Sequence, residues 1–219
     1  MRHDARMSTS TLVHDERNNL ADLLLASGPD APTLCAGWTT RDLAAHLVIR
    51  EARPDAAAGI VIAPLANWTS KVQAENAARP YEELVAQFRQ GPPRWSPFSI
   101  ASVDAAANIT EFVVHGEDVR RAQPDWAARS IDAELNDVLW ARLPNMSRLL
   151  LRSLSMGITI ERSDTDAAPA AIKTGSPVLS LTGTPLDLML ILHGRSVVDV
   201  RIDGDATAVA AFRAAKLGL

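Results

Sequence analysis

The sequence predicts an α+β fold in which an N-terminal helical bundle is followed by a small α/β domain. Up to about residue 150, apolar residues recur at helical spacing, in segments that Pro and Gly separate. After about residue 155, short runs rich in β-branched residues partly alternate with polar residues, as strands do. This change of period divides the chain into two expected domains, residues 8–153 and residues 154–219.

Helix starts and stops are clearest in the N-terminal domain. The first helix ends before Gly28, and the second begins after Thr39, where Thr and the acidic Asp42 three positions on form a capping box. The second helix must end near Arg53, because Pro54 follows it. Three more helices are expected: one from Tyr81 to Phe88 that Gly91 stops, one over 103–123 that Pro124 closes, and one from Ile131 to about Leu143, capped by Ser130 and kinked or ended by Pro144.

The C-terminal domain mixes strands and helices. The segments 157–161, 178–181 and 197–202 are short and β-branched, and we expect three strands there. A helix opens at Thr184 and Pro185, since proline is favoured in a first helical turn, and an Ala-rich helix closes the chain as far as Leu217.

The overall composition argues against a charged macromolecular partner. The 219 residues carry 22 Lys and Arg against 26 Asp and Glu, a net charge of −4, so we expect no nucleic-acid binding. No apolar run approaches the roughly 20 residues that span a bilayer, and the first residues do not resemble a signal peptide. Cys35 is the single cysteine, which suits a reducing compartment. We therefore expect a cytoplasmic monomer or homodimer that binds no membrane.

The helix over 103–123 carries a polar stripe. Positions 104, 108, 111, 115 and 118 lie along one helical face, and the neighbouring stripe is apolar. The residues at these positions are Asp104, Asn108, Glu111, His115 and Asp118. Taken alone, Glu111 and His115 are more typical of a solvent-facing surface than of a ligand pair.

His46 adds a third potential ligand from the preceding helix. It lies between Leu43 and Leu47, in mostly apolar surroundings. Two histidines and one carboxylate on two helices of a bundle form a set that holds Zn²⁺ or another divalent ion and leaves a coordination position open. The spacing alone leaves two interpretations open, this metal site or two unrelated structural histidines.

Two segments carry a family resemblance: Cys35 to Leu47 (CAGWTTRDLAAHL) and Glu111 to Arg121 (EFVVHGEDVRR). They resemble the mycothiol-dependent maleylpyruvate isomerase-like proteins of the DinB superfamily. Residues 50–55 (REARPD) and 91–97 (GPPRWSP) are similar to an actinobacterial branch known only as metal-binding. The resemblance implies a DinB-like bundle and a sterol-carrier-like C-terminal domain. It also implies that His46, Glu111 and His115 bind a divalent metal, usually zinc.

The same resemblance implies an activity. A metal-bound, low-molecular-weight thiol such as mycothiol would act on a small electrophilic or anionic substrate, by isomerisation or thiol transfer. A non-catalytic, metal-dependent small-ligand-binding protein is the alternative. The superfamily's Gly-Arg after an apolar helix corresponds to Gly194 and Arg195. We expect Arg195 to face the metal cavity as a catalytic, carboxylate-holding residue, against the alternative that it satisfies carbonyls at its own helix end.

Other polar residues near these positions have structural explanations. Arg50 and Arg53 are more typical of cations at a helix C-terminus than of a substrate clamp. Asn108 and Asp118 either orient the metal ligands or face water, and the sequence favours neither. Cys35, beside apolar residues, is expected to pack as a small hydrophobe.

Overall fold

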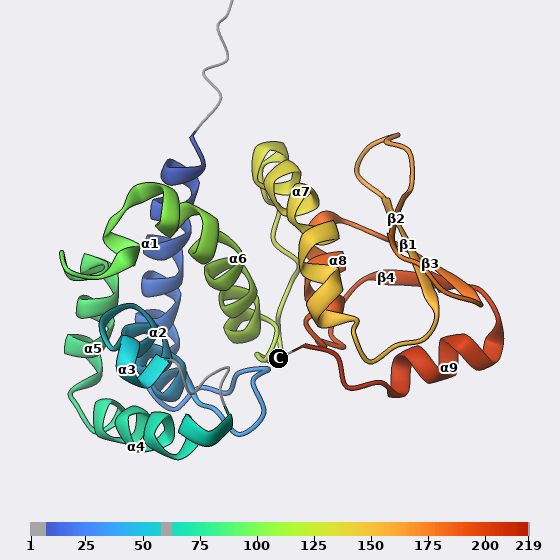
Figure 1. The fold of residues 1–219 in the computed structure, drawn as a ribbon. Helices are drawn as coiled ribbons and strands as arrows, with labels where there is room; N and C mark the ends of the chain where they lie inside the picture. The colour runs from blue at the N-terminus through green and yellow to red at the C-terminus, as the bar shows by residue number, and fades with distance from the viewer. Residues whose placement is uncertain (1–7, 58–62, 219) are drawn as a thin grey trace, which may run out of the picture. The chain divides into compact units, whose positions relative to one another are not determined.

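Two compact units make up the chain, and the division between them lies between Arg129 and Ser130. Their architecture is known from a computed structural model, which describes residues 8–57 and 63–218. Figure 1 shows helices in the first unit, and a sheet with helices in the second. The α+β fold class predicted from the sequence is therefore confirmed.

The first unit is helical throughout its regular structure. Helix α1 packs mainly against α6 and also against α5, while α2 packs against α4 and α5. The elements are α1 (Thr9–Ser27), α2 (Thr40–Ala52), α3 (Pro54–Ala57), the 3-10 turn η2 (Ala63–Leu65), α4 (Ala66–Ala77), α5 (Tyr81–Gln90), the 3-10 turn η3 (Pro97–Ser99) and α6 (Ala101–Arg120).

Local sequence signals explain where these helices begin and end. The capping box forms as predicted, since the Asp42 carboxylate accepts the Thr39 backbone N–H at 2.9 Å and fixes the start of α2. Gly91 follows the last residue of α5 with a φ of 85°, a conformation that a side chain would strain. These two signals fix where α2 begins and where α5 ends.

Apolar side chains from α1, α2, α5 and α6 form the core of the first unit. Leu24, Leu43, Phe88 and Phe112 are all fully buried, and the rings of Phe88 and Phe112 meet edge to face at 5.3 Å. This packing holds α6 rigidly against the other helices, so that it can present side chains at fixed positions.

The second unit contains a four-stranded sheet, in the order β2-β1-β3-β4, among its described residues. Strands β1 and β3 are parallel, and the outer pairs are antiparallel. The elements are α7 (Ala133–Leu150), β1 (Gly157–Arg162), β2 (Ala170–Lys173), β3 (Val178–Gly183), α8 (Pro185–Leu192), β4 (Val200–Asp203) and α9 (Ala206–Ala214).

Helix α7 differs from the prediction in its bounds and in its packing. Its N-cap is Asp132 and not Ser130, and it continues past Pro144 to Leu150. Helix α7 packs against α8 and β2, so it belongs to the second compact unit, which begins at Ser130. The expected domain boundary between residues 153 and 154 lies instead shortly after the end of this helix. Within the described residues, no helix is long and apolar enough to cross a membrane.

Candidate metal centre

Helices α2 and α6 bring together the three residues that the sequence singled out as metal ligands. His46 Nε2 lies 3.0 Å from Glu111 Oε1, and His115 Nε2 lies 3.2 Å from the same oxygen. One donor atom from each residue lies within 4.8 Å of the other two. His46 and Glu111 are 65 positions apart, so the fold, and not local sequence, creates this cluster.

The donor atoms fit a divalent metal such as zinc. With Zn–N and Zn–O bonds of about 2.0–2.1 Å, the ligand atoms of a tetrahedral ion lie roughly 3.3 Å from one another. The separations of 3.0 and 3.2 Å between the histidine nitrogens and Glu111 Oε1 are close to this value. Two imidazoles and one carboxylate also match the three-ligand set that leaves a fourth position for another ligand.

The charge states of His46 and Glu111 suit metal ligation. Burial lowers the pKa of His46 below its ordinary value, because the imidazolium would lose its hydration. Burial alone would raise the pKa of Glu111, but hydrogen bonds from His115 and His46, together with the charges of His115 and Arg50, hold it well below its usual range. A neutral imidazole and an ionised carboxylate are the forms that bind metals.

His115 is polarised from the opposite side by Asp118. Burial alone would lower the pKa of His115, but contacts with Asp118, Cys35 and Glu111 raise it well above its ordinary value. A metal ion that binds through His115 Nε2 must displace a proton there, so its affinity falls as the pH decreases.

Asp118 has the geometry of a residue that orients a ligand. Its carboxylate is fully buried, and Oδ2 lies 3.0 Å from His115 Nδ1. This contact holds a proton on Nδ1 and leaves Nε2 directed toward Glu111 and His46. Of the two interpretations that the sequence left open for Asp118, orientation of a ligand is therefore the one that the structure favours.

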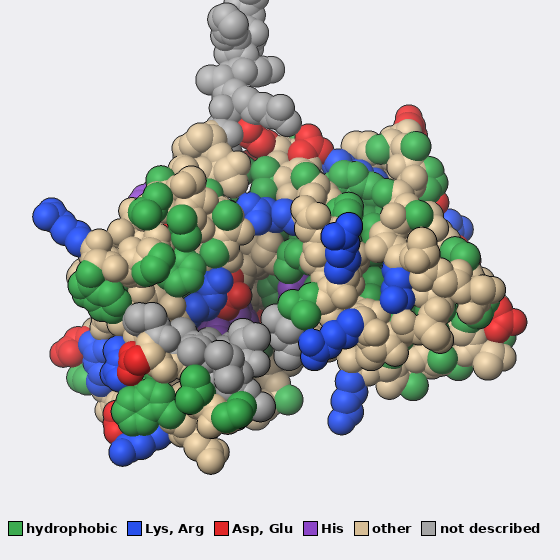
Figure 2. Space-filling view, viewed as in Figure 1, with side chains coloured by type: hydrophobic (Ala, Val, Ile, Leu, Met, Phe, Trp, Pro, Cys, Tyr) green, Lys and Arg blue, Asp and Glu red, His purple; other side chains and the backbone are tan. Residues whose placement is uncertain are grey.

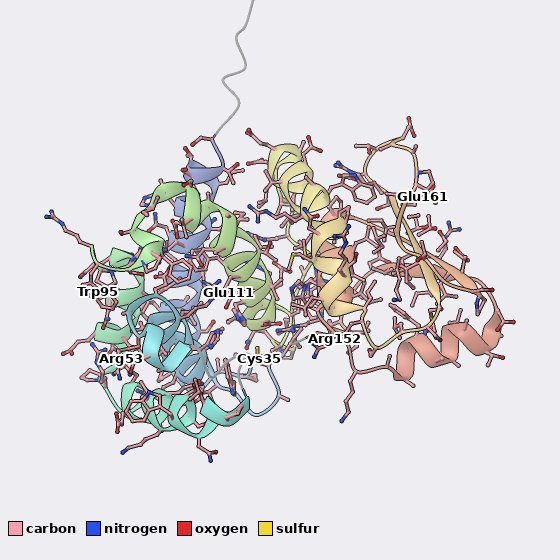
Figure 3. All side chains as sticks on the ribbon, viewed as in Figure 1. Cys35, Arg53, Trp95, Glu111, Arg152 and Glu161 are labelled. Atoms are coloured by element: carbon pink, nitrogen blue, oxygen red, sulfur yellow. The ribbon has the colours of Figure 1, made fainter. Side chains whose placement is uncertain are left out.

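Cys35 differs from its predicted role as a small packed hydrophobe. Its thiol donates to Asp118 Oδ2 at 3.1 Å, and Sγ lies 3.8 Å from His115 Nδ1, so it does not simply pack as a small hydrophobe. The Leu34 backbone N–H also donates to the Asp118 carbonyl, which ties this loop to the C-terminal end of α6. Figure 3 marks Cys35 near that end of α6 and Glu111 farther along the same helix.

Arg50 also differs from its predicted role. It follows His46 by one turn of α2, and its guanidinium donates to Asn108 Oδ1 and to the Ala107 carbonyl. Its Nε lies 3.4 Å from Glu111 Oε1, so it belongs to the cluster and is not merely a cation at a helix end. Arg53, by contrast, pairs with the exposed Asp55.

Behind the three donors lies a buried polar network that the sequence did not reveal. Asn108, which is fully buried, donates to Glu51 Oε1 at 2.8 Å and to Asp104 Oδ1 at 2.6 Å. Glu51 in turn accepts two hydrogen bonds of 2.7 Å from Arg17 on α1. The network therefore links α1 through Asn108 and Arg50 to Glu111.

Aromatic rings border the cluster. The Trp38 ring lies 5.1 Å from that of His46, and the Phe98 ring lies 5.1 Å from the guanidinium carbon of Arg50. Figure 2 shows basic, acidic and histidine surfaces side by side in the helical unit. Ionisable groups are therefore exposed together at this face, with aromatic groups beside His46 and Arg50.

Arg195 lies in the second unit, just past the end of α8. Its guanidinium donates to the His193 carbonyl at 2.6 Å, which is the helix-end contact named as the alternative to a catalytic role. Gly194, with a φ of 81°, makes the turn that precedes it. A role of Arg195 in ligand binding stays a prediction.

Comparison with known proteins finds a matching family model and solved structures of similar fold. Residues 12–143 match the family model described as the mycothiol maleylpyruvate isomerase N-terminal domain. Two solved structures resemble the chain: the mycothiol-dependent maleylpyruvate isomerase, at 15% identity and a TM-score of 0.58, and a histidine-to-alanine mutant of that isomerase, at 14% and 0.57. Each match covers 89% of this chain and 91% of the other, and at such identities it shows a shared fold. No curated protein matches the chain.

Proposed function

The chain belongs to the mycothiol maleylpyruvate isomerase N-terminal domain family, and on that premise we propose that it is a zinc-dependent enzyme that uses a low-molecular-weight thiol. His46, Glu111 and His115 are the proposed metal ligands. The observation that carries the proposal is the set of three donor atoms, from two helices, at the separations expected around a divalent ion.

The proposed thiol is mycothiol or a close analogue, and the substrate is a small electrophile. A bound zinc ion would lower the pKa of a coordinated thiol and supply a thiolate nucleophile at neutral pH. In an isomerisation, the thiolate would form a bond to one carbon of a cis double bond conjugated with a carbonyl, and the π electron pair would move onto the carbonyl oxygen to give an enolate. After rotation about the resulting single bond, the enolate would return its electron pair, expel the thiolate and restore the double bond as trans. In a thiol transfer, the adduct is the product.

The chain's own residues have distinct parts in this proposal. Asp118 holds a proton on His115 Nδ1 and so keeps Nε2 available for the metal. The tilted Trp38 ring, 5.1 Å from that of His46, supplies an apolar neighbour on one side of this proposed ligand. Arg195 is retained as a proposed carboxylate-holding residue of the second unit.

Metal analysis of the purified protein tests the proposal first. Protein prepared without added metal should contain about one zinc per chain, and His46→Ala and His115→Ala should each lose it, because two ligands do not hold zinc tightly. His14→Ala is the matched control, since His14 is exposed and bonds to Asn18. Metal content that both ligand variants retain would refute the site.

A second measurement separates an enzyme from a binding protein. Calorimetry should detect mycothiol binding to the zinc-loaded protein and none to His46→Ala. Loss of the cis absorbance of maleylpyruvate on addition of protein and thiol would then establish isomerisation. Ligand binding with no turnover of such substrates would favour the non-catalytic alternative. The cytoplasmic location, the absence of nucleic-acid partners and the monomeric or homodimeric state stay predictions.

A further inference from the structure

The geometry points to Arg50 as the group that binds a carboxylate of the substrate beside the metal ligands. This inference rests on the proposed function and specifies the chemical class of its ligand: a small organic anion that places one carboxylate against the guanidinium.

The position of Arg50 follows from helical geometry. Arg50 and His46 are four residues apart on α2, so their side chains lie on the same face of the helix. Both reach Glu111 Oε1, at 3.4 Å from Arg50 Nε and 3.0 Å from His46 Nε2. A ligand bound at the metal would therefore lie within reach of the guanidinium.

The guanidinium is fixed in place but not fully used. It donates to the Asn108 side chain and to the Ala107 carbonyl, and the Phe98 ring lies 5.1 Å from its central carbon. A guanidinium has five N–H groups in a planar fork. Within the described chain, one N–H on each terminal nitrogen of Arg50 has no partner, and 18% of the side chain is exposed. A pre-oriented fork of this kind matches a carboxylate.

Charge balance favours an anion at this position. In the part of the chain that the structure describes, Glu111 supplies the one carboxylate within ion-pair distance of Arg50. The two hydrogen-bond partners of Arg50, on Asn108 and Ala107, are neutral. If Glu111 binds a metal ion, its negative charge no longer neutralises the partly buried guanidinium of Arg50. The carboxylate of a bound ligand would then neutralise this positive charge.

The competing explanation is that Arg50 only ties α2 to α6. Arg53 separates the two explanations, because it is three residues farther along the chain, carries the same charge, and forms an exposed pair with Asp55. If removal of a positive charge had only a general effect, substitution of either arginine would weaken the binding of an anion. If Arg50 forms a carboxylate subsite, only substitution of Arg50 would weaken it.

Calorimetry with a charged probe and a neutral probe tests the inference. Maleate is the anionic probe, and its uncharged diamide is the matched neutral probe. For the zinc-loaded protein, we expect Arg50→Gln to weaken maleate binding by about 10- to 100-fold, as for loss of a charge-assisted hydrogen-bonded pair. Arg53→Gln should stay within about 2-fold of wild type, and the weak diamide binding should be equal in all three proteins.

The metal content of the same samples distinguishes failure of the proposed function from failure of the inference about Arg50. If the wild-type chain holds no metal, the proposed function fails and the inference fails with it. If metal is present in every variant but Arg50→Gln binds maleate as wild type does, the inference alone is overturned. If Arg50→Gln does not fold, Arg50→Lys decides, because lysine keeps the charge but cannot hold Asn108 and Ala107 while it contacts a ligand. Maleate affinity unchanged in Arg50→Lys would overturn the inference.

Discussion

Asp118 lies beside one of the three proposed metal ligands and is placed to orient it. Its buried carboxylate lies 3.0 Å from His115 Nδ1 and favours a proton on that nitrogen. The Cys35 thiol in turn donates to the same carboxylate oxygen. The Asp118 carboxylate that faces His115 is therefore also contacted by a side chain from the loop before α2.

We predict that Asp118→Asn lowers the zinc affinity of the protein by about 10- to 100-fold, the usual effect of removing a carboxylate partner from a ligating histidine. Asparagine keeps the shape of the side chain but removes the charge that supports the imidazole. Competition titration against a chelator of known affinity measures the change. Cys35→Ala is the control, with an expected change of less than about 3-fold, because Asp118 and His115 stay in contact. Equal affinities in wild type and Asp118→Asn would contradict the prediction.

The sequence singled out the three residues of the cluster, but not the roles of Cys35 and Arg50 beside them. His46, Glu111 and His115 could be found because helical spacing and a family resemblance both single them out. Cys35 and Arg50 were assigned structural roles, since their contacts with Asp118 and Asn108 depend on how the loop before α2, and α2 itself, pack against α6. No spacing rule encodes such a contact between distant segments.

At the scale of elements, Arg17 joins four helices. It lies on α1, forms two hydrogen bonds of 2.7 Å with Glu51 on α2, donates to the Phe88 carbonyl on α5, and contacts Asp104 on α6. Arg17 and Glu51 are both almost fully buried. Such a pair is costly to break, because removal of one partner leaves the other as an uncompensated buried charge.

We therefore predict that Arg17→Met destabilises the protein by about 3–5 kcal/mol in urea unfolding. The double variant Arg17→Met/Glu51→Leu should recover much of this loss, since it removes both charges. Arg89→Met is the control, because Arg89 pairs with Asp22 at the surface, and it should cost less than about 1 kcal/mol. A single variant as stable as this control would show that the buried pair contributes little.

Helices with clear caps and the strands β1 and β3 were predicted well, whereas α7, β2 and α4 were not. The bounds of α2 and α5 follow from Thr39, Asp42 and Gly91, which act locally. Helix α7 runs through Pro144 because tertiary contacts sustain it: Leu150 is buried, and the Ser147 hydroxyl donates to the Ile172 carbonyl of β2. Strand β2 has only four residues, and α4 has little amphipathic character. Neither segment therefore shows a hydrophobic periodicity from which a strand or helix could be predicted.

At the scale of the whole molecule, we expect the second unit to take part in ligand binding. Arg195 is the residue on which we base this test. We predict that Arg195→Ala raises the dissociation constant of the zinc-loaded protein for maleate by about 10-fold, as expected for loss of one charge-assisted contact. Metal content and melting temperature should stay nearly unchanged. Lost stability with unaltered maleate binding would instead assign Arg195 to the end of α8, where it bonds the His193 carbonyl.

The pairing of α1 with α6 has a consequence for how the protein is made. Helix α1 finds its main packing partner in a helix that begins at Ala101, after all the other helices of the first unit. During synthesis on the ribosome, α1 therefore emerges well before its main packing partner, and the apolar face that α6 covers stays uncovered in that interval. Because Glu111 and His115 also lie on α6, the three proposed ligands come together only when this helix docks, so we expect any metal to be captured after the first unit has folded.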